Sequence, residues 1–119
     1  MSDPSDLQGQ PHEREEILRF VISFCLNLSI EFKNFTFRSI DDGGMGSFLC
    51  FCNNIEDIKR SEKILFSEAE FFDEDGIDVF IEFYRISNFY FEVNFWKVDF
   101  SMLKSFPNSN SIINIKCIK

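Results

Sequence analysis

The sequence contains no apolar run close to the roughly 18 residues that a membrane-spanning helix needs. Its first residues, from Met1 to Pro11, are polar and include no apolar leader of the kind that directs secretion. It also contains no linker, and 119 residues suffice for one hydrophobic core but not for two. These absences predict one domain that acts inside the cell, and we expect it in the cytoplasm.

Basic residues are scarce, since 12 lysines and arginines stand against 20 acidic residues and the net charge is −8. A nucleic acid or an anionic membrane surface requires a basic protein surface, so the composition argues against both as partners. Complementary charge favours a basic protein as the partner instead.

Residues suited to metal binding or nucleophilic catalysis are also few. His12 is the one histidine, and it lies at the polar start of a predicted helix, away from any expected cleft. The cysteines have no metal-ligand spacing and no secretory leader precedes them, so we expect free thiols. They are Cys25, Cys50, Cys52 and Cys117. We predict no metal and no cofactor.

The pattern that is present predicts one helix followed by strands. After a polar lead-in over residues 1–10, which we expect to be disordered, apolar residues recur at helical spacing from Pro11 to Leu28. Expected strands cover residues 32–40, 48–52, 64–72, 77–86, 90–98 and 112–118, with a short helical turn within 53–62. The predicted fold is α+β, a single domain over residues 11–119. Its N-terminal helix packs on one face of an antiparallel meander sheet of about five to six strands.

Turn residues determine which side chains share a face of this sheet. A three-residue loop from Glu74 to Gly76 pairs Asp73 with Ile77, and its last residue is the glycine that this hairpin type requires. A three-residue loop in the next hairpin is expected to pair Ile86 with Tyr90, because a shorter turn would set acidic side chains against apolar ones.

In this register the central strands have two unlike faces. The inner face is apolar and is expected to receive the helix; it comprises Ala69, Phe71, Ile77, Val79, Ile81, Phe83, Phe91, Val93 and Phe95. The outer face mixes acidic and aromatic side chains; it comprises Glu68, Glu70, Phe72, Asp78, Phe80, Glu82, Tyr84, Tyr90, Glu92, Asn94 and Trp96. Glu68 is predicted to lie opposite Glu82, where two like charges cost stability.

Two explanations of the outer face stay open. Its aromatic side chains can anchor a protein interface while its carboxylates receive lysine and arginine side chains. Alternatively, the C-terminal segment or another subunit covers the aromatic side chains, and the acidic ones are ordinary solvated charges. Trp96 is open in the same way, since it can lock the last strand into the core or anchor an interface.

Three patterns suggest chemistry, but none predicts an enzyme. Asp73-Glu74-Asp75-Gly76 lacks the spacing and the closing glutamate of a calcium loop, and a tight turn explains it better. The glycines from Gly43 to Gly46 lack the following helix and the lysine of a phosphate site. Glu68 and Glu82 lie on an open sheet face without a pocket that would shift their acidity. We therefore expect no catalytic activity.

Three stretches of the chain resemble a family of small, uncharacterised bacterial domains. They are Asp42–Ser47 (DGGMGS), Glu68–Gly76 (EAEFFDEDG) and Phe95–Ser101 (FWKVDFS), and a glutamate stands four residues before the tryptophan of the last one. The resemblance covers Asp41 to Ser101. Some small acidic proteins of this kind are similar to immunity proteins encoded beside toxins, including those of contact-dependent growth inhibition systems. The resemblance implies a fold and a role but no catalytic residue.

Resemblance and charge together predict an immunity protein that binds and blocks a basic cognate toxin domain, such as a nuclease. A nuclease must bind an anionic substrate, so a rigid acidic surface suits its inhibitor. The alternative is a structural or regulatory domain that homodimerises through the same aromatic face. The predicted partner-binding residues are Asp41, Asp42, Glu68, Glu70, Asp73, Glu74, Asp75, Asp78, Phe80, Glu82, Tyr84, Tyr90, Glu92 and Trp96.

Overall fold

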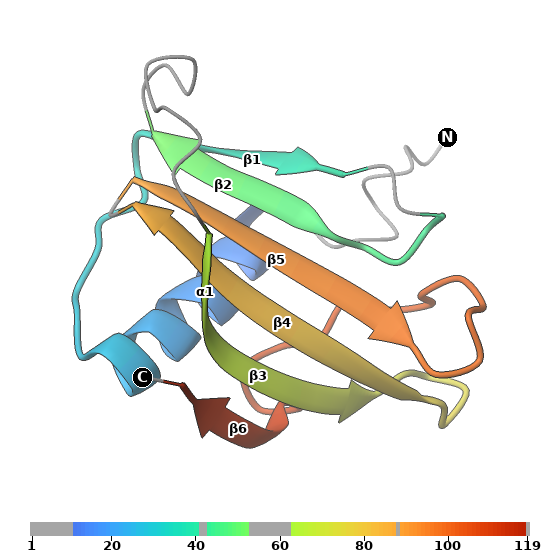
Figure 1. Ribbon diagram of the computed structural model, residues 1–119. Helices are drawn as coiled ribbons and strands as arrows, with labels where there is room; N and C mark the ends of the chain where they lie inside the picture. Colours follow the sequence, from blue (N-terminus) through green and yellow to red (C-terminus); the bar gives the residue numbers. More distant parts are fainter. Residues whose placement is uncertain (1–10, 41–42, 53–62, 88, 119) are drawn as a thin grey trace.

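The computed structural model describes residues 11–40, 43–52, 63–87 and 89–118, which form one helix and six strands (Figure 1). The elements are α1 (Pro11–Leu26), β1 (Phe35–Ser39), β2 (Phe48–Cys52), β3 (Ile64–Phe72), β4 (Asp78–Ser87), β5 (Tyr90–Lys97) and β6 (Ile113–Cys117). The predicted lead-in over residues 1–10 and the predicted helical turn within 53–62 lie outside the described residues, as does the side chain of His12.

The six strands form one antiparallel sheet in the order β1-β2-β5-β4-β3-β6. β3, β4 and β5 form a meander at the centre of the sheet, while β2 pairs with β5 at one side of it and β6 pairs with β3 at the other. α1 crosses one face of the sheet, and no helix of the described chain covers the opposite face (Figure 1). The α+β fold predicted from the sequence is therefore confirmed.

The β3–β4 hairpin has the predicted register. The Asp73 N–H donates to the Ile77 carbonyl over 3.0 Å, and the Gly76 N–H donates to the Asp73 carbonyl over 2.8 Å. Gly76 adopts a φ of 77°, which a residue with a side chain rarely does. In this register Glu68 lies opposite Glu82.

The β4–β5 hairpin differs from the prediction at its turn. Ser87, and not Ile86, pairs with Tyr90, because a bulge at Ile86 separates this pair from the Arg85–Phe91 pair. The bulge absorbs one residue, so the register of the rest of the hairpin is the predicted one.

The core lies between α1 and the inner face of the sheet. α1 contributes Ile17, Leu18, Val21 and Ile22, each at most 1 % exposed. The predicted inner-face residues are buried with the exception of Ile77, which lies in the hairpin and is half-buried. Full burial of one such side chain stabilises the fold by about 1.5–3 kcal/mol, so these contacts hold α1 firmly against the inner face. The outer face has no such cover from α1.

The two boundaries that differ most from the prediction do so for local reasons. α1 ends at Leu26 because Asn27 takes the left-handed conformation, with a φ of 52°. β1 begins at Phe35 because Phe32 is buried and its carbonyl accepts the Phe35 N–H in a turn. Within the residues described here, no helix has the length and apolar character to cross a membrane.

Cys25 and Cys117 form a disulfide, which corrects the expectation of four free thiols. The bond joins the last turn of α1 to β6. The two cysteines are 92 positions apart in the sequence, and their Cα atoms are 5.2 Å apart. Cys50 and Cys52 are free, and burial raises the pKa of the Cys50 thiol, which makes it a poor nucleophile.

Candidate functional site

The EAEFFDEDG and FWKVDFS motifs meet at Lys97, the last residue of β5. Lys97 is fully buried, and its Nζ donates to Asp73 Oδ2 over 2.9 Å, to Asp75 Oδ2 over 2.6 Å and to the Met102 carbonyl over 3.2 Å. This ion-pair cluster, which we call the Lys97 cluster, ties the end of β5 to the β3–β4 turn. Figure 1 shows that hairpin and the end of β5 side by side.

Asp73 also connects this cluster to the loop that follows β5. Its carboxylate accepts the backbone N–H groups of Glu74, Lys104 and Ser105, and the Ser105 hydroxyl. Burial alone would raise the pKa of Asp73, but the hydrogen bonds from Lys97 and these groups outweigh it and lower the pKa to about 2. The two aspartates likewise raise the pKa of Lys97 despite its burial. The cluster is therefore ionised across the neutral pH range.

Acid is expected to weaken the fold through Asp73. Because its pKa falls from 3.8 to about 2 on folding, Asp73 contributes its full stabilisation above its unfolded pKa and loses it as the pH falls through its folded pKa. The shift corresponds to about 2 kcal/mol at neutral pH. Urea unfolding of the wild type and of Asp73→Asn between about pH 2 and pH 7 measures this contribution. The difference in the free energy of unfolding between the two proteins should narrow as the pH falls. A difference that stays constant would contradict the lowered pKa of Asp73.

The third motif, the glycine turn, packs against the same loop. The Gly44 carbonyl accepts the Leu103 N–H over 3.1 Å, and Ser47 Oγ accepts the Phe95 N–H over 3.0 Å. Gly46 has a φ of 88°, and a Cβ atom on it would lie 2.6 Å from Leu103 Cδ2, so any other residue here would be strained and would displace the Leu103 side chain. The three motifs thus describe one structural cluster at one end of the sheet.

This cluster lies directly beneath the outer face because side chains alternate along a strand. Lys97 points inward and is buried, whereas Trp96 and Val98 on either side of it are more than 40 % exposed, at 41 % and 42 %. In the same way Asp73 is buried, whereas the preceding Phe72 is 58 % exposed. The ion pair therefore fixes the backbone that presents these side chains to solvent.

The acidic turn residues differ in what they offer a partner. Asp73 was expected at the binding surface, but it is 4 % exposed and its carboxylate is engaged within the fold, so it does not belong to that surface. Glu74 and Asp75 are exposed, although Asp75 also binds Lys97. Asp41 and Asp42 lie outside the described residues.

None of the predicted outer-face residues is fully buried, and the aromatic side chains among them are either exposed, as Phe72 and Trp96 are, or half-buried, as Phe80, Tyr84 and Tyr90 are. Phe80 and Trp96 stack with their ring centroids 5.0 Å apart. Trp96 is therefore not a core residue. β6 pairs with the edge of β3 instead of crossing the sheet, so the alternative in which the C-terminal segment covers the aromatic side chains is wrong.

Acidic side chains lie close to one another on this face. Glu68 pairs with Glu82 across β3 and β4, as predicted. Burial, followed by the hydrogen bond and the charge of Glu70, raises the pKa of Asp78. Asp78 Oδ1 is closed to solvent and has no hydrogen-bond partner. Neighbouring carboxylates of this kind destabilise the free protein and favour a cation between them.

Two cations at the margin of the outer face were not predicted. Lys63 donates to Glu92 Oε2 over 2.7 Å, and its Nζ lies 4.5 Å from the centroid of the Tyr84 ring. Lys116 of β6 pairs with Glu68 in register. Lys63 could have been found by extending the predicted strand by one residue, whereas the place of Lys116 depends on the docking of β6. The margin is therefore less acidic than the strand pattern suggests.

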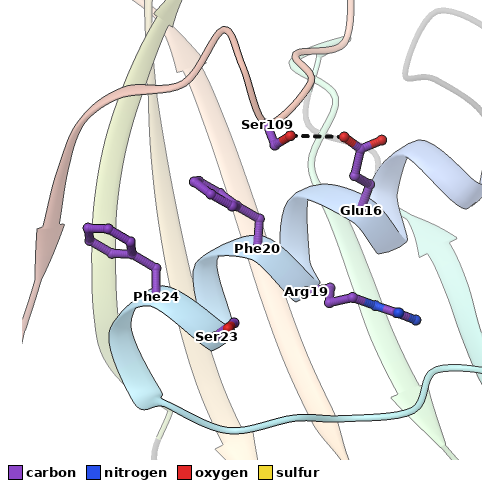
Figure 2. A pocket seen from close by; sticks show the side chains of 6 residues that line it. All are labelled: Glu16, Arg19, Phe20, Ser23, Phe24 and Ser109. Carbon is purple, nitrogen blue, oxygen red and sulfur yellow. Dashed lines mark hydrogen bonds between the residues drawn. The ribbon is translucent and has the colours of Figure 1, made fainter.

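A shallow pocket lies away from the outer face, between α1 and the loop before β6 (Figure 2). Its volume is about 400 Å³, and it is lined by Glu16, Arg19, Phe20, Ser23, Phe24 and Ser109. The Ser109 hydroxyl donates to Glu16 Oε1 over 2.9 Å, and the lining includes no histidine or cysteine to form a nucleophile–base pair. The described parts of the chain also contain no group of three or more His, Cys, Asp or Glu side chains that could hold a metal ion.

Fold and site together define a small α+β domain in which a buried lysine–aspartate cluster supports an open sheet face of acidic and aromatic side chains. The chain belongs to a family described as a domain of unknown function, DUF6984, whose model matches residues 10–107. The match runs from α1 through the loop after β5 and ends before β6. No curated protein and no solved structure matches the chain.

Proposed function

We propose that this protein is an immunity protein that binds a basic toxin domain, such as a nuclease, and blocks it with the outer face. One observation carries the proposal: the Glu68–Glu82 pair lies beside the Phe80–Trp96 stack, in which Trp96 is exposed and Phe80 is half-buried. Aromatic side chains of this type anchor protein interfaces, and paired carboxylates gain stability when a basic side chain lies between them.

The free protein holds these carboxylates at a cost. Two like charges directly opposite in a sheet destabilise it by a few tenths of a kcal/mol, roughly the size of other cross-strand effects. A basic partner would remove this cost on binding, and the net charge of −8 would accelerate its approach. The three sequence motifs on which the resemblance rests form the Lys97 cluster and the glycine turn. These lie beneath the hairpin end of the same outer face.

A homodimer through the same face is the weaker alternative. Two overlapping outer faces would bring the carboxylates of one copy, such as Glu68 and Glu82, toward the carboxylates of the other. That repulsion opposes self-association, whereas a basic partner experiences attraction. A single species of twice the monomer mass on a sizing column, with an elution volume that does not change with salt, would favour the homodimer.

The proposal predicts capture of the toxin by charge. The tagged protein, co-expressed with the product of the gene immediately upstream, should retain that product at about 0.15 M salt and lose most of it at about 1 M. Cells that express the upstream product should survive when the protein is present. Failure of both capture and rescue, with a dimer on the sizing column, would overturn the proposal.

A matched pair of variants tests the face itself. Glu68→Gln/Glu82→Gln should weaken capture and should raise the free energy of unfolding by a few tenths of a kcal/mol, on the order of other cross-strand effects. Glu16→Gln/Glu31→Gln changes the net charge equally, but its residues lie on α1 and in the segment before β1. If both variants weaken capture to the same degree, only net charge matters and the outer face is not the interface.

A further inference from the structure

The outer face ends at the β3–β4 hairpin in an apolar patch that surrounds one carboxylate. The patch comprises Phe72, Phe80, Trp96 and Val98, and we call it the hairpin-end patch. Asp78 lies at its centre in the sheet register. This is the part of the outer face where the largest apolar side chains and a solvent-excluded carboxylate oxygen occur together.

The strand pairing places each member of the patch. Phe72 of β3 pairs with Asp78 of β4, and the Val98 N–H donates to the Asp78 carbonyl over 3.1 Å, so both flank Asp78 in one row. The next row on the same face holds the Phe80–Trp96 stack. Large exposed apolar side chains on both sides of a carboxylate are unusual on a solvated surface and are typical of an interface.

The charges at this end of the face are unbalanced. Glu70 lies in register opposite Phe80 and beside Asp78, and it accepts a hydrogen bond from the Asn114 side chain. Neither carboxylate forms an ion pair with a basic side chain among the residues that the structure describes. Lys97, the nearest residue of opposite charge along β5, faces the other side of the sheet and is committed to Asp73 and Asp75.

The patch is rigid because of what lies beneath it. Lys97 and Asp73 are the immediate chain neighbours of Trp96, Val98 and Phe72, and both are buried in the Lys97 cluster. A surface that is held in place loses little conformational entropy when a partner binds. This preorganisation favours a binding role for the patch.

We propose that the hairpin-end patch receives an arginine side chain of the basic partner, with the guanidinium against the Trp96 ring and donating to Asp78. The proposal rests on the proposed function and specifies its anchor. A guanidinium is planar, stacks on aromatic rings and is weakly hydrated, so it tolerates the apolar surroundings better than the ammonium of lysine does. The guanidinium would also bring a cation to the Asp78 carboxylate, which forms no ion pair among the described residues of the free protein.

A peptide probe tests the patch without the toxin. Because the chain has one tryptophan, fluorescence excited selectively at tryptophan reports on Trp96 alone. Hexa-arginine, titrated into the full chain at about 0.15 M salt, should change this emission, and hexa-lysine should bind more weakly. Asp78→Asn should weaken hexa-arginine binding by about fivefold and raise the urea midpoint, whereas the control Glu31→Gln should change neither.

The outcomes separate the patch from the proposed function. If Asp78→Asn binds hexa-arginine as the wild type does, or if hexa-lysine binds equally well, the arginine site is overturned. Loss of peptide binding in Glu68→Gln/Glu82→Gln but not in Asp78→Asn would leave the outer face as the interface and remove the patch from it. Toxin capture that survives Asp78→Asn unchanged would also remove the patch from the interface. Failure of the wild type in both capture and rescue, with a dimer on the sizing column, overturns the function itself.

Discussion

Lys97→Met is expected to lower the free energy of unfolding by about 3–5 kcal/mol, the range seen when one partner of a buried ion pair is removed. The substitution leaves Asp73 buried and ionised without its cation, although the backbone N–H groups of Lys104 and Ser105 still bind it. Methionine fills the space of the lysine stem, so the loss reports on the charge and not on a cavity. Urea unfolding followed by far-ultraviolet circular dichroism measures the change.

Lys63→Met is the matched control for this experiment. Lys63 also forms an ion pair, with Glu92 over 2.7 Å, but its side chain is 48 % exposed. Exposed pairs contribute about 1 kcal/mol or less, so this variant should stay close to the wild type. Equal losses in the two variants would show that the Lys97 cluster contributes no more than a surface pair.

The double variant Lys97→Met/Asp73→Asn separates the pair from its surroundings. If the cost of Lys97→Met arises from the uncompensated aspartate, neutralising Asp73 should recover part of it. The sum of the free-energy losses in the two single variants should then exceed the loss in the double variant.

Alkali gives an independent check, because it should weaken the fold through Lys97 as acid does through Asp73. Since the pKa of Lys97 is raised, its contribution is complete below pH 10.5 and disappears as the pH rises through the folded value.

Most of the fold follows from alternation and from one turn. The glycine at position 76 and the requirement that like side chains share a face fix the β3–β4 register. The same requirement in the β4–β5 hairpin then fixes both faces of the three strands. The same alternation carries a signal for the ion pair. Asp73 continues the buried series Ala69 and Phe71, and Lys97 continues Phe91, Val93 and Phe95. Two opposite charges in line with buried positions predict a buried ion pair.

The remaining features depend on contacts that no local pattern encodes. The disulfide requires that β6 dock beside β3 and that α1 end above it, and these segments lie 92 residues apart. The pairing of β2 with β5 likewise crosses two strands of the chain. In the candidate site, the outer face was predictable because it is local to one meander. The contact of Asp73 with the Lys104 N–H was not, because that residue comes 31 positions later in the chain.

Gly46→Ala is expected to cost about 2–4 kcal/mol, because two separate effects add. Gly46 has a φ of 88°, and the new Cβ atom would meet Leu103 Cδ2 at 2.6 Å. The Leu103 side chain is buried, and the Leu103 N–H donates a hydrogen bond to the Gly44 carbonyl. The packing around the side chain and the fixed backbone both limit how far Leu103 can move. Gly43→Ala is the matched control. Its φ is 79°, but no atom lies within 4 Å of its Cβ position.

Urea midpoints of the two glycine variants therefore separate backbone strain from steric contact. Gly43→Ala should lose about 1–2 kcal/mol from strain alone, and Gly46→Ala should lose clearly more. The excess measures how tightly the glycine turn is packed on the loop after β5, and that loop also carries the residues that bind Asp73. Equal losses would mean that the turn and the loop move apart easily. In that case the backbone beneath Trp96 and Val98 would lack the rigidity on which the proposed interface depends.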